Sequence, residues 1–406
     1  MQMKPKLLVL TSTFPRWRND TDPPFVFELS RRLTSTFDVT VHAPHYPGAK
    51  TRETMDGMYI YRFRYFLAPF EKLAGSTGIM PTLQSKKLFY GLIPFFLMAQ
   101  FFSLALLIYR KRPDIIHAHW IIPQGFLSVF VQQLFGIPVV TTAHGTDIFG
   151  LQGVFPTFIK KITVTRAAGV TVVSRALTSA VDSIAGKQVN AEVIPMGVNS
   201  SKFCPDKRDD LIRIRHGIEG PFLLFVGRLT EVKGLEFLID AIPLILHKFS
   251  DLRLIVIGNG EQERELRTQA TERGLDSHVY FLGSLPNSEL PAYYATADVF
   301  IGPSIRVTGG VTEGFGLTFV EAAMSGCPVI GTMTGGIGEI IKDNETGFLV
   351  PERDSVSLAE KITYILTHDM EIQRIKEDAM ARCLKKYDWK VIANRYEKFF
   401  IQCINF

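Results

Sequence analysis

Short apolar runs alternate with longer stretches of mixed polarity along most of the chain. In the first half the runs cover 6–12, 38–43, 115–118, 138–143, 169–173 and 192–194, and in the second half 222–226, 252–257, 279–282, 299–301 and 329–331. Runs that are apolar at consecutive positions are typical of strands buried on both faces, and the stretches between them are long enough for helices. The pattern therefore predicts an α/β protein whose parallel sheets are covered by helices on both sides.

A polar stretch at 200–219 separates two such series of runs, so we expect a linker there. This gives an N-terminal domain, 1–200, a C-terminal domain, 201–385, and a terminal segment, 386–406, whose helix packs back on the first domain. We expect two doubly wound, Rossmann-like domains that face each other across a cleft, because ligands of such sheets bind at the carboxyl ends of the strands.

One apolar segment, from Leu88 to Tyr109, does not fit this alternation. Its only plainly polar side chains are Gln100 and Ser103, and three basic residues, 110–112, follow it directly. By length and hydropathy it can span a bilayer, lie in the membrane interface, or form a partly exposed helix of the first domain. Pro94 and the strand that follows so soon argue against a span, but the pattern leaves the three alternatives open.

Charge is distributed unevenly between the two halves. Residues 1–200 carry 21 Lys and Arg against 11 Asp and Glu, a balance of +10, whereas residues 201–406 carry 24 against 29, a balance of −5. A basic first half suits an anionic partner such as phospholipid headgroups or a phosphate-bearing acceptor, and the alternative is a solubilising surface. Nucleic acid is not expected as a partner, because the basic residues do not interleave with exposed-looking aromatic residues.

The four cysteines are far apart and form no pair with metal-ligand spacing. The first residues pass directly into an apolar strand rather than through a signal-peptide pattern. We therefore expect a cytoplasmic protein without disulfides or structural zinc, and the basic half and the apolar segment add the expectation of a peripheral position on the inner face of the membrane.

The stretch 312–330 combines a glycine-punctuated loop with an apolar helix. Glu313 lies in the loop and Glu321 in the helix. Free N–H groups at a helix N-terminus attract phosphate, and each carboxylate can accept from two hydroxyls, so this stretch suits a polyol that carries phosphate. Arg228 and Lys233 follow strand 222–226 and can neutralise the charge of a departing diphosphate. The alternative for such a pair is ordinary surface charge.

Several of these segments together resemble a known family. They are GRLTEVKG at 227–234, EGFGLTFVEAAMSGCPVI at 313–330, TGGIGEII at 334–341, DIIHAHW at 114–120 and AHGTD at 143–147. They resemble the retaining GT-B-fold glycosyltransferases of family 4, also called glycosyltransferase group 1. The resemblance implies transfer of a hexose from a nucleotide-sugar donor, a UDP-sugar or GDP-sugar, to an acceptor hydroxyl in glycolipid, polysaccharide or other glycoconjugate synthesis. It also implies no cofactor and no obligatory metal.

The resemblance also implies roles for individual residues. Arg228 and Lys233 match the ligands of the diphosphate, Glu313 matches the carboxylate on the donor sugar, and Glu321 matches the residue on the ribose. His144 matches the histidine that faces the reacting sugar. The remaining donor-side positions are Gly314, Phe315, Gly316 and Leu317, whose loop amides meet the sugar and phosphate, and Leu285, in the segment that contacts the base. Glu321 has an alternative role as the cap of a neighbouring loop.

The loop after the first strand differs from the family pattern. Many relatives have glycines there, whereas the first glycine of this chain is Gly48. We expect this loop, 13–24, to face the acceptor through Arg16 and Arg18, and the alternative is an ordinary exposed loop. His119 and Asp147 are further acceptor-side candidates. A metal pair made by His117 and His119 is not expected, because no acidic cluster accompanies them.

Two other functions remain as alternatives to glycosyl transfer. Paired doubly wound domains also form hinged, non-enzymatic sugar-binding or nucleotide-sugar-binding proteins. A nucleotide-sugar epimerase of related fold would turn over its donor without any acceptor. The glycines of 258–260 lack the third glycine of a dinucleotide motif, so we expect a tight turn there rather than a nicotinamide site.

Overall fold

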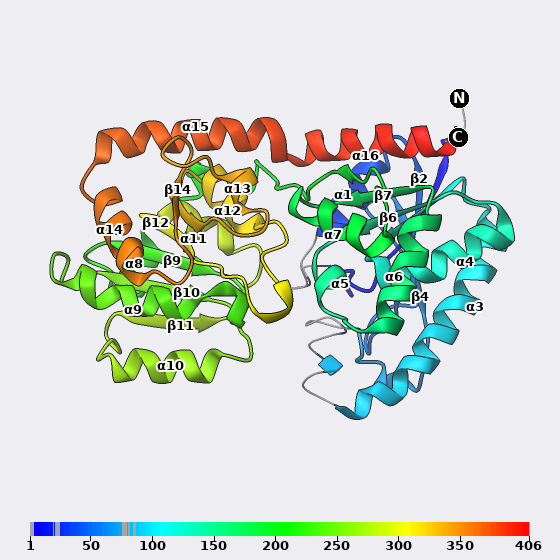
Figure 1. Cartoon of the computed structure of the whole chain (residues 1–406), viewed down its shortest axis with the longest axis horizontal. Coiled ribbons are helices and arrows are strands. Elements are labelled where there is room, and N and C mark those ends of the chain that lie inside the picture. Colours follow the sequence, from blue (N-terminus) through cyan, green and yellow to red (C-terminus); the bar gives the residue numbers. More distant parts are fainter. Residues whose placement is uncertain are drawn as a thin grey trace. The chain divides into compact units, whose positions relative to one another are not determined.

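The computed structural model describes residues 4–18, 20, 25–74, 79, 82–83 and 87–405. The chain forms two compact units, each built around one sheet (Figure 1). The first unit contains Met1–Met196 together with Trp389–Phe406, and the second contains Gly197–Asp388.

The first unit contains an eight-stranded sheet in the order β3-β4-β2-β1-β5-β6-β7-β8. Its strands are β1 (Lys6–Leu10), β2 (Asp38–Pro44), β3 (Arg52–Met55), β4 (Met58–Phe63), β5 (Ile115–His119), β6 (Val139–Ala143), β7 (Gly169–Val172) and β8 (Glu192–Val193). Neighbouring strands run parallel except β3 and β4, which pair antiparallel. Strands β5 and β6 are buried at every position, as expected for a sheet covered on both faces.

The helices of the first unit cover this sheet. They are α1 (Phe25–Leu33), α3 (Ile93–Lys111), α4 (Phe126–Phe135), α5 (Thr146–Phe149), α6 (Val154–Arg166), α7 (Ala176–Ala185) and α16 (Trp389–Ile404), with short turns η1 (Ala68–Phe70), η2 (Lys87–Leu92) and η3 (Ile121–Gly125). The last helix, α16, packs against α1 and β5. Its Phe400 ring lies 6.1 Å from that of Phe37, so the C-terminal segment completes the core of the first unit.

The second unit contains a six-stranded sheet in the order β11-β10-β9-β12-β13-β14, in which all neighbours are parallel. Its strands are β9 (Phe222–Val226), β10 (Arg253–Ile257), β11 (Val279–Gly283), β12 (Val299–Gly302), β13 (Val329–Thr332) and β14 (Phe348–Val350). Its helices are α8 (Leu211–Arg215), α9 (Leu235–Leu246), α10 (Glu263–Glu272), α11 (Leu290–Thr296), α12 (Leu317–Met324), α13 (Ile337–Ile340), α14 (Ser355–Ile365) and α15 (Asp369–Tyr387), with turns η4 (Pro205–Lys207), η5 (Glu231–Lys233) and η6 (Thr308–Gly310).

The sheet orders confirm the predicted fold class of two α/β units with doubly wound, parallel sheets. In each sheet the chain crosses once from one side of its first strand to the other, at a reversal point between β1 and β5 in the first unit and between β9 and β12 in the second. Loops that leave two such strands diverge, and ligands of open α/β sheets bind in the space between them. The two reversal points therefore mark the places where a site is expected in each unit.

The polar stretch at 200–219 does not form an extended linker. It contains η4 and α8 and belongs to the second unit. The Arg213 guanidinium forms an ion pair of 2.5 Å with Asp298, and it also donates to the Gly220 carbonyl. The stretch looks like a linker in the sequence because the charged partner of Arg213 lies far along the chain.

The apolar segment from Leu88 to Tyr109 forms η2 and α3. This helix is long and apolar enough to cross a membrane by length and composition. Its inner side, which includes Phe96, Gln100 and Leu104, is buried against the rest of the first unit. The helix is thus part of the fold of the first unit, while its outer side remains exposed.

Candidate active site

The loops after β9 and β12 bring together the charged residues predicted for the donor. Lys233 ends the turn η5 after β9, and its ammonium donates a short hydrogen bond to the Glu313 carboxylate, which lies in the loop after β12. Their side chains are 20% and 14% exposed, so the ion pair is largely withdrawn from water. The reversal point of the second sheet therefore places an ammonium and a carboxylate in direct contact.

Glu313 is ionised at neutral pH because of its cationic neighbours. Burial alone would raise the pKa of Glu313, but the charge of Lys233 and then that of Arg228 hold this pKa below its ordinary value. Arg228 itself is exposed at the end of β9. Two cations and one carboxylate thus share the carboxyl end of the sheet, where an anionic ligand that also carries hydroxyls finds complementary groups.

Glycines let the backbones around these residues approach closely. Gly335 has a φ of +53°, and a Cβ on it would lie 1.8 Å from the Glu313 carbonyl oxygen. The N–H of Gly336 donates to the same carbonyl at 3.2 Å. The segment after β13 therefore supports the loop of Glu313, which gives a physical reason for the glycines at 335 and 336.

The glycines of 258–260 support the loop after β9 in a similar way. A Cβ on Gly258 would lie 1.8 Å from the Gly227 carbonyl oxygen, and one on Gly260 would lie 2.1 Å from that of Leu229. The N–H of Leu229 also donates to the Asn259 carbonyl at 2.9 Å. The segment 258–260 thus lies close against the loop after β9 and buttresses the part that contains Arg228, while the tight turn stays a prediction.

Helix α12 begins directly after the loop of Glu313. Gly316 has a φ of +90°, which turns the chain so that the helix starts at Leu317. Phe315, which lies between Glu313 and Gly316 in the sequence, is buried, and its ring centroid lies 5.4 Å from that of Tyr387. The orphan N–H groups of the first turn of α12 thus follow Glu313 within a few residues, as the sequence predicts for a phosphate-binding segment.

Glu321 lies one turn further along α12. Its carboxylate accepts a hydrogen bond of 3.0 Å from the hydroxyl of Tyr294, a fully buried residue of α11. Burial raises the pKa of Glu321 to about 7, although the Tyr294 hydroxyl acts in the opposite direction. Glu321 therefore does not cap a loop as in the alternative interpretation, and Tyr294 is a neighbour that the sequence did not indicate.

Leu285 follows β11, two strands away from β9. The N–H of Gly258 donates to the Gly283 carbonyl at 2.9 Å, so the turns after β10 and β11 are joined. The loops after β11, β9 and β12, together with helix α12, thus contain the predicted donor-side residues, and the loop after β10 lies between those of β11 and β9. The contacts above connect each of these loops to the next, while the ligand roles of the residues stay predictions.

In the first unit, His119 ends β5 and His144 follows β6. The Nδ1 atom of His119 lies 3.1 Å from the Nε2 atom of His144, and the rings stack with centroids 5.3 Å apart. Phe25 and Trp120 flank His144, with centroids 5.1 Å and 5.0 Å from its ring. The two predicted histidines therefore form one aromatic cluster at the carboxyl end of the sheet.

Both imidazoles are neutral at physiological pH. Burial lowers the pKa of His144 to about 3 and lowers that of His119 well below its ordinary value. A neutral imidazole donates one hydrogen bond through one ring nitrogen and accepts one through the other, but it does not serve as a cationic acid. The geometry therefore favours a hydrogen-bonding role for His144.

Asp147 holds the loop of His144 in place. Its carboxylate accepts from the backbone N–H groups of Ile121 at 2.7 Å, His144 at 3.0 Å and Gly145 at 3.0 Å. The residue is buried beneath the loop. These contacts support a positioning role, and contact between Asp147 and an acceptor stays a prediction.

Arg16 and Arg18, predicted to meet an anionic acceptor, differ in their surroundings. Arg16 is paired with Asp20, and its guanidinium lies 4.7 Å from the ring centroids of both Trp17 and Tyr46. Arg18 is exposed. The contact with Asp20 is local in the sequence, whereas the Tyr46 contact requires the fold. The rest of the loop, 19 and 21–24, lies outside the described residues.

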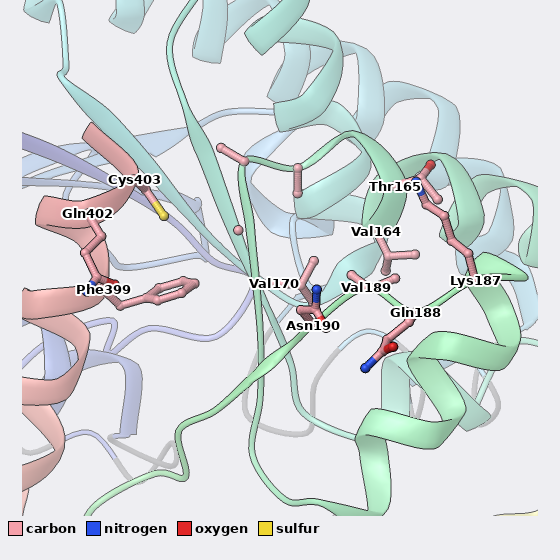
Figure 2. Close-up of a pocket in the computed structure, with 13 residues that line it drawn as sticks. Val164, Thr165, Val170, Lys187, Gln188, Val189, Asn190, Phe399, Gln402 and Cys403 are labelled. Carbon is pink, nitrogen blue, oxygen red and sulfur yellow. The ribbon is translucent and has the colours of Figure 1, made fainter. Parts of the chain in front are cut away.

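A cavity of about 310 Å³ lies elsewhere in the first unit (Figure 2). Val170, Asn190, Phe399 and Cys403 are among its lining residues. It adjoins the start of β7, whereas the predicted residues lie at the carboxyl ends of the strands. This cavity is therefore separate from the candidate site.

Within the described ranges, no group of three or more His, Cys, Asp or Glu side chains has the arrangement of a metal site.

Family models match both halves of the chain. The model described as glycosyltransferase family 4 matches residues 24–202, and the model described as glycosyl transferases group 1 matches residues 208–382. The second match contains the loops of Lys233 and Glu313 and helix α12. The matches thus cover both units and include the candidate donor-side residues.

Individual proteins agree with these matches. A phosphatidyl-myo-inositol mannosyltransferase of Mycobacterium leprae is 37% identical over 43% of this chain and 45% of its own length. A GDP-mannose-dependent alpha-(1-6)-phosphatidylinositol monomannoside mannosyltransferase of Mycolicibacterium smegmatis is 29% identical over 66% of this chain and 71% of its own. The chain thus spans about half of the first relative and over two thirds of the second.

Solved structures show the same architecture. Sucrose-phosphate synthase of Thermosynechococcus elongatus superimposes with a TM-score of 0.77 over 98% of this chain and 99% of its own, at 20% identity. At this identity the likeness shows the fold alone, which is GT-B. Together with the family matches to both halves, it establishes that the chain belongs to the group 1, family 4 glycosyltransferases.

Proposed function

We propose that the enzyme transfers a hexose, with retention at the anomeric carbon, from a nucleotide-sugar to a hydroxyl of a lipid-linked acceptor. The observation that carries the proposal is the contact between Lys233 and ionised Glu313, with Arg228 nearby, at the reversal point of the second sheet. This arrangement suits a donor that presents a diphosphate and sugar hydroxyls together.

The chain's own residues supply positioning and charge. Arg228, Lys233 and the first-turn N–H groups of α12 would stabilise the diphosphate as negative charge develops on it. Glu313 would accept hydrogen bonds from hydroxyls of the transferred sugar, and Glu321 from the ribose diol. The acceptor hydroxyl would attack the anomeric carbon on the face that the diphosphate leaves, and a departing diphosphate oxygen would take its proton. Contact of His144 with the reacting sugar stays a prediction from the resemblance.

Mannose on GDP is the donor that we propose first. The M. smegmatis relative is named as GDP-mannose-dependent, and both mycobacterial relatives are named for phosphatidylinositol-type acceptors. A lipid-linked acceptor also suits the basic first half of the chain. We accordingly propose a cytoplasmic enzyme that works at the inner surface of a membrane, without a cofactor or an obligatory metal.

The test is transfer from a panel of sugar nucleotides. Release of nucleoside diphosphate is measured for GDP-mannose, UDP-glucose and other common donors, with and without EDTA, and with and without phosphatidylinositol or polyprenyl phosphate. Transfer that needs both donor and lipid, survives EDTA and gives a product with the donor's anomeric configuration supports the proposal. An inverted product, loss of activity in EDTA, or epimerisation without acceptor contradicts it.

Replacing Lys233 tests the role of the ion pair in the same assay. We expect Lys233→Ala to lower kcat/KM by about 100- to 1,000-fold, the range found when one group that stabilises developing negative charge is removed. Lys248→Ala, at an exposed lysine of the same unit, is the matched control. Near-normal turnover of Lys233→Ala, with circular dichroism like that of the control, would exclude the diphosphate role.

A further inference from the structure

One surface of the first unit is apolar but not covered by the rest of the protein. The outer side of α3, drawn in cyan along the edge of the unit in Figure 1, exposes Phe95, Met98, Phe102, Leu106 and Tyr109. Each of these side chains is at least 50% exposed. Their spacing of three or four residues places them in one stripe along the helix, which we call the α3 stripe.

The stripe continues onto the turn that precedes the helix. The Phe66 ring lies 5.4 Å from that of Phe95 and 6.2 Å from that of Phe70. Phe70 is 52% exposed and Leu67, between the two aromatic residues, is 66% exposed. A continuous apolar patch on the surface of a folded domain marks a site that binds a membrane or another protein.

A buried carboxylate fixes this turn in place. Glu71, with no exposed surface, accepts hydrogen bonds from the N–H of Tyr65 at 2.8 Å and from the Arg64 guanidinium at 2.7 Å, and it contacts the His45 ring at 2.5 Å. Burying a carboxylate is costly unless such partners surround it. The exposed aromatic residues are therefore held on a fixed platform rather than left to collapse onto the core.

The inner side of α3 fixes the depth to which the helix can enter a membrane. Phe96, Gln100 and Leu104 are buried, and Ser103 lies 3.0 Å from the buried His42. A helix that spanned the bilayer would expose these groups to lipid and remove them from the core of the unit. Only the outer stripe can enter a bilayer while the fold stays intact, so the geometry is that of an interfacial helix.

Charge distinguishes a membrane from a second copy of the chain. Residues 72–113 contain no aspartate or glutamate but include six basic residues. Of these, Lys72, Lys87, Arg110 and Arg112 are exposed, so α3 has basic side chains near both ends. Two copies paired along the stripe would place basic residues against basic residues in either orientation, whereas an anionic lipid surface attracts them all.

We propose that the α3 stripe and the turn at 66–70 dock the first unit on the headgroup and upper acyl region of an anionic lipid bilayer. The proposal deepens the proposed function, on which it rests for the need to reach a lipid-linked acceptor. It assigns the contact to one face of one helix. The aromatic and aliphatic side chains would enter the interface, while Lys72, Lys87, Arg110 and Arg112 would meet lipid phosphates.

Flotation of the full chain with vesicles tests this surface directly. Vesicles of phosphatidylcholine alone are compared with vesicles that also contain phosphatidylglycerol. We expect the wild-type chain to float with the anionic vesicles. The double variant Met98→Gln/Phe102→Gln should lower the partition coefficient at least about 10-fold, because two exposed apolar side chains no longer enter the interface.

A second double variant provides a matched control. Met370 and Val356, in the second unit, are 92% and 57% exposed, and Met370→Gln/Val356→Gln removes apolar surface of similar kind. We expect this control to float like the wild type. Arg110→Gln/Arg112→Gln should weaken binding to anionic vesicles by about 5-fold per residue and leave binding to neutral vesicles unchanged.

Several outcomes overturn the proposal. The first is failure of the wild-type chain to float. The second is an equal loss of flotation in Met98→Gln/Phe102→Gln and in the control Met370→Gln/Val356→Gln. The third is a wild-type dimer that Met98→Gln/Phe102→Gln converts to a monomer in light scattering. Release of nucleoside diphosphate with a water-soluble acceptor is measured in parallel and should be unchanged by the stripe variants. If the wild-type chain floats but transfers no sugar, the proposed function fails and the docking surface stands.

Discussion

Burial and charge act differently on the two glutamates that flank the start of α12. Glu313 contacts Lys233 and has a lowered pKa, whereas Glu321 contacts the neutral hydroxyl of Tyr294 and has a pKa raised by burial to about 7. Two carboxyls eight residues apart therefore differ in charge near neutral pH. We expect Glu313 to be a permanent anion and Glu321 to titrate in the working range of the enzyme.

This difference predicts a pH dependence of nucleotide binding. Above pH 7 Glu321 is mainly ionised and can accept from both ribose hydroxyls, whereas below pH 7 it is mainly protonated. We expect the Kd for nucleoside diphosphate, measured by calorimetry, to rise as the pH is lowered from 8 to 6, by up to about 10-fold for each unit below the pKa.

Glu321→Gln serves as the comparison, because its side chain does not titrate. The phosphates of the ligand also gain protons near pH 6, and this contribution is common to both proteins. The difference between the two Kd profiles therefore reports Glu321 alone. Parallel profiles for wild type and variant would show that the ribose contact does not depend on an ionised Glu321.

At the scale of single residues, the sequence indicated which residues are candidates for the site better than it indicated which side chains they contact. The loop position of Glu313 and the helix position of Glu321 follow from local glycine and apolar patterns. The contacts of Glu321 with Tyr294 and of Arg16 with Tyr46 join residues 27 and 30 positions apart. No local pattern encodes such contacts, because they arise only when the strands are placed side by side.

At the scale of elements, the strand-end loops depend on glycines that support one another. Gly335 tests this support because two separate effects meet there. Its φ of +53° disfavours any side chain, and a Cβ would also overlap the Glu313 carbonyl oxygen. Gly310 has a φ of +77° but nothing within 4 Å of its Cβ position, so it isolates the first effect.

We expect Gly335→Ala to lower the free energy of unfolding of the second unit by at least about 2 kcal/mol more than Gly310→Ala does, since only the former forces the loop of Glu313 to move. Urea unfolding followed by circular dichroism gives the comparison. The same variant should weaken donor binding. Equal destabilisation by the two substitutions would show that the close approach at Gly335 does not hold the loop.

Element prediction from the sequence succeeded where strands are apolar on both faces. The limits of β5, β6, β9 and β12 fall within two residues of the expected runs. The antiparallel pair β3 and β4 and the long helix α15 were not expected. Strand β3 and helix α15 contain no continuous apolar run, and β4 has only a short one, from Met58 to Tyr61. The 88–109 segment was ambiguous for the opposite reason, since both of its sides are apolar and only the fold determines which side is buried.

At the scale of the whole molecule, the chain crosses between units twice, near 196 and near 388. Each unit has its own core. The buried residues that pack around β9, β10 and β12 all lie between Leu223 and Ile375, within the second unit. A unit that buries its own core and contains all the predicted donor-side residues should fold and bind donor independently.

We therefore expect the fragment 197–388 to unfold cooperatively and to bind nucleoside diphosphate with a Kd within about 10-fold of that of the full chain. A 10-fold change in Kd corresponds to about 1.4 kcal/mol of binding free energy, which is the most that we expect the fragment to lose with the first unit. It should transfer no sugar, since the acceptor side is proposed to lie in the first unit. Calorimetry on the fragment and on its Lys233→Ala variant separates folding from binding. A cooperatively folded fragment that binds no nucleotide would show that the donor-side loops need the first unit to form a site.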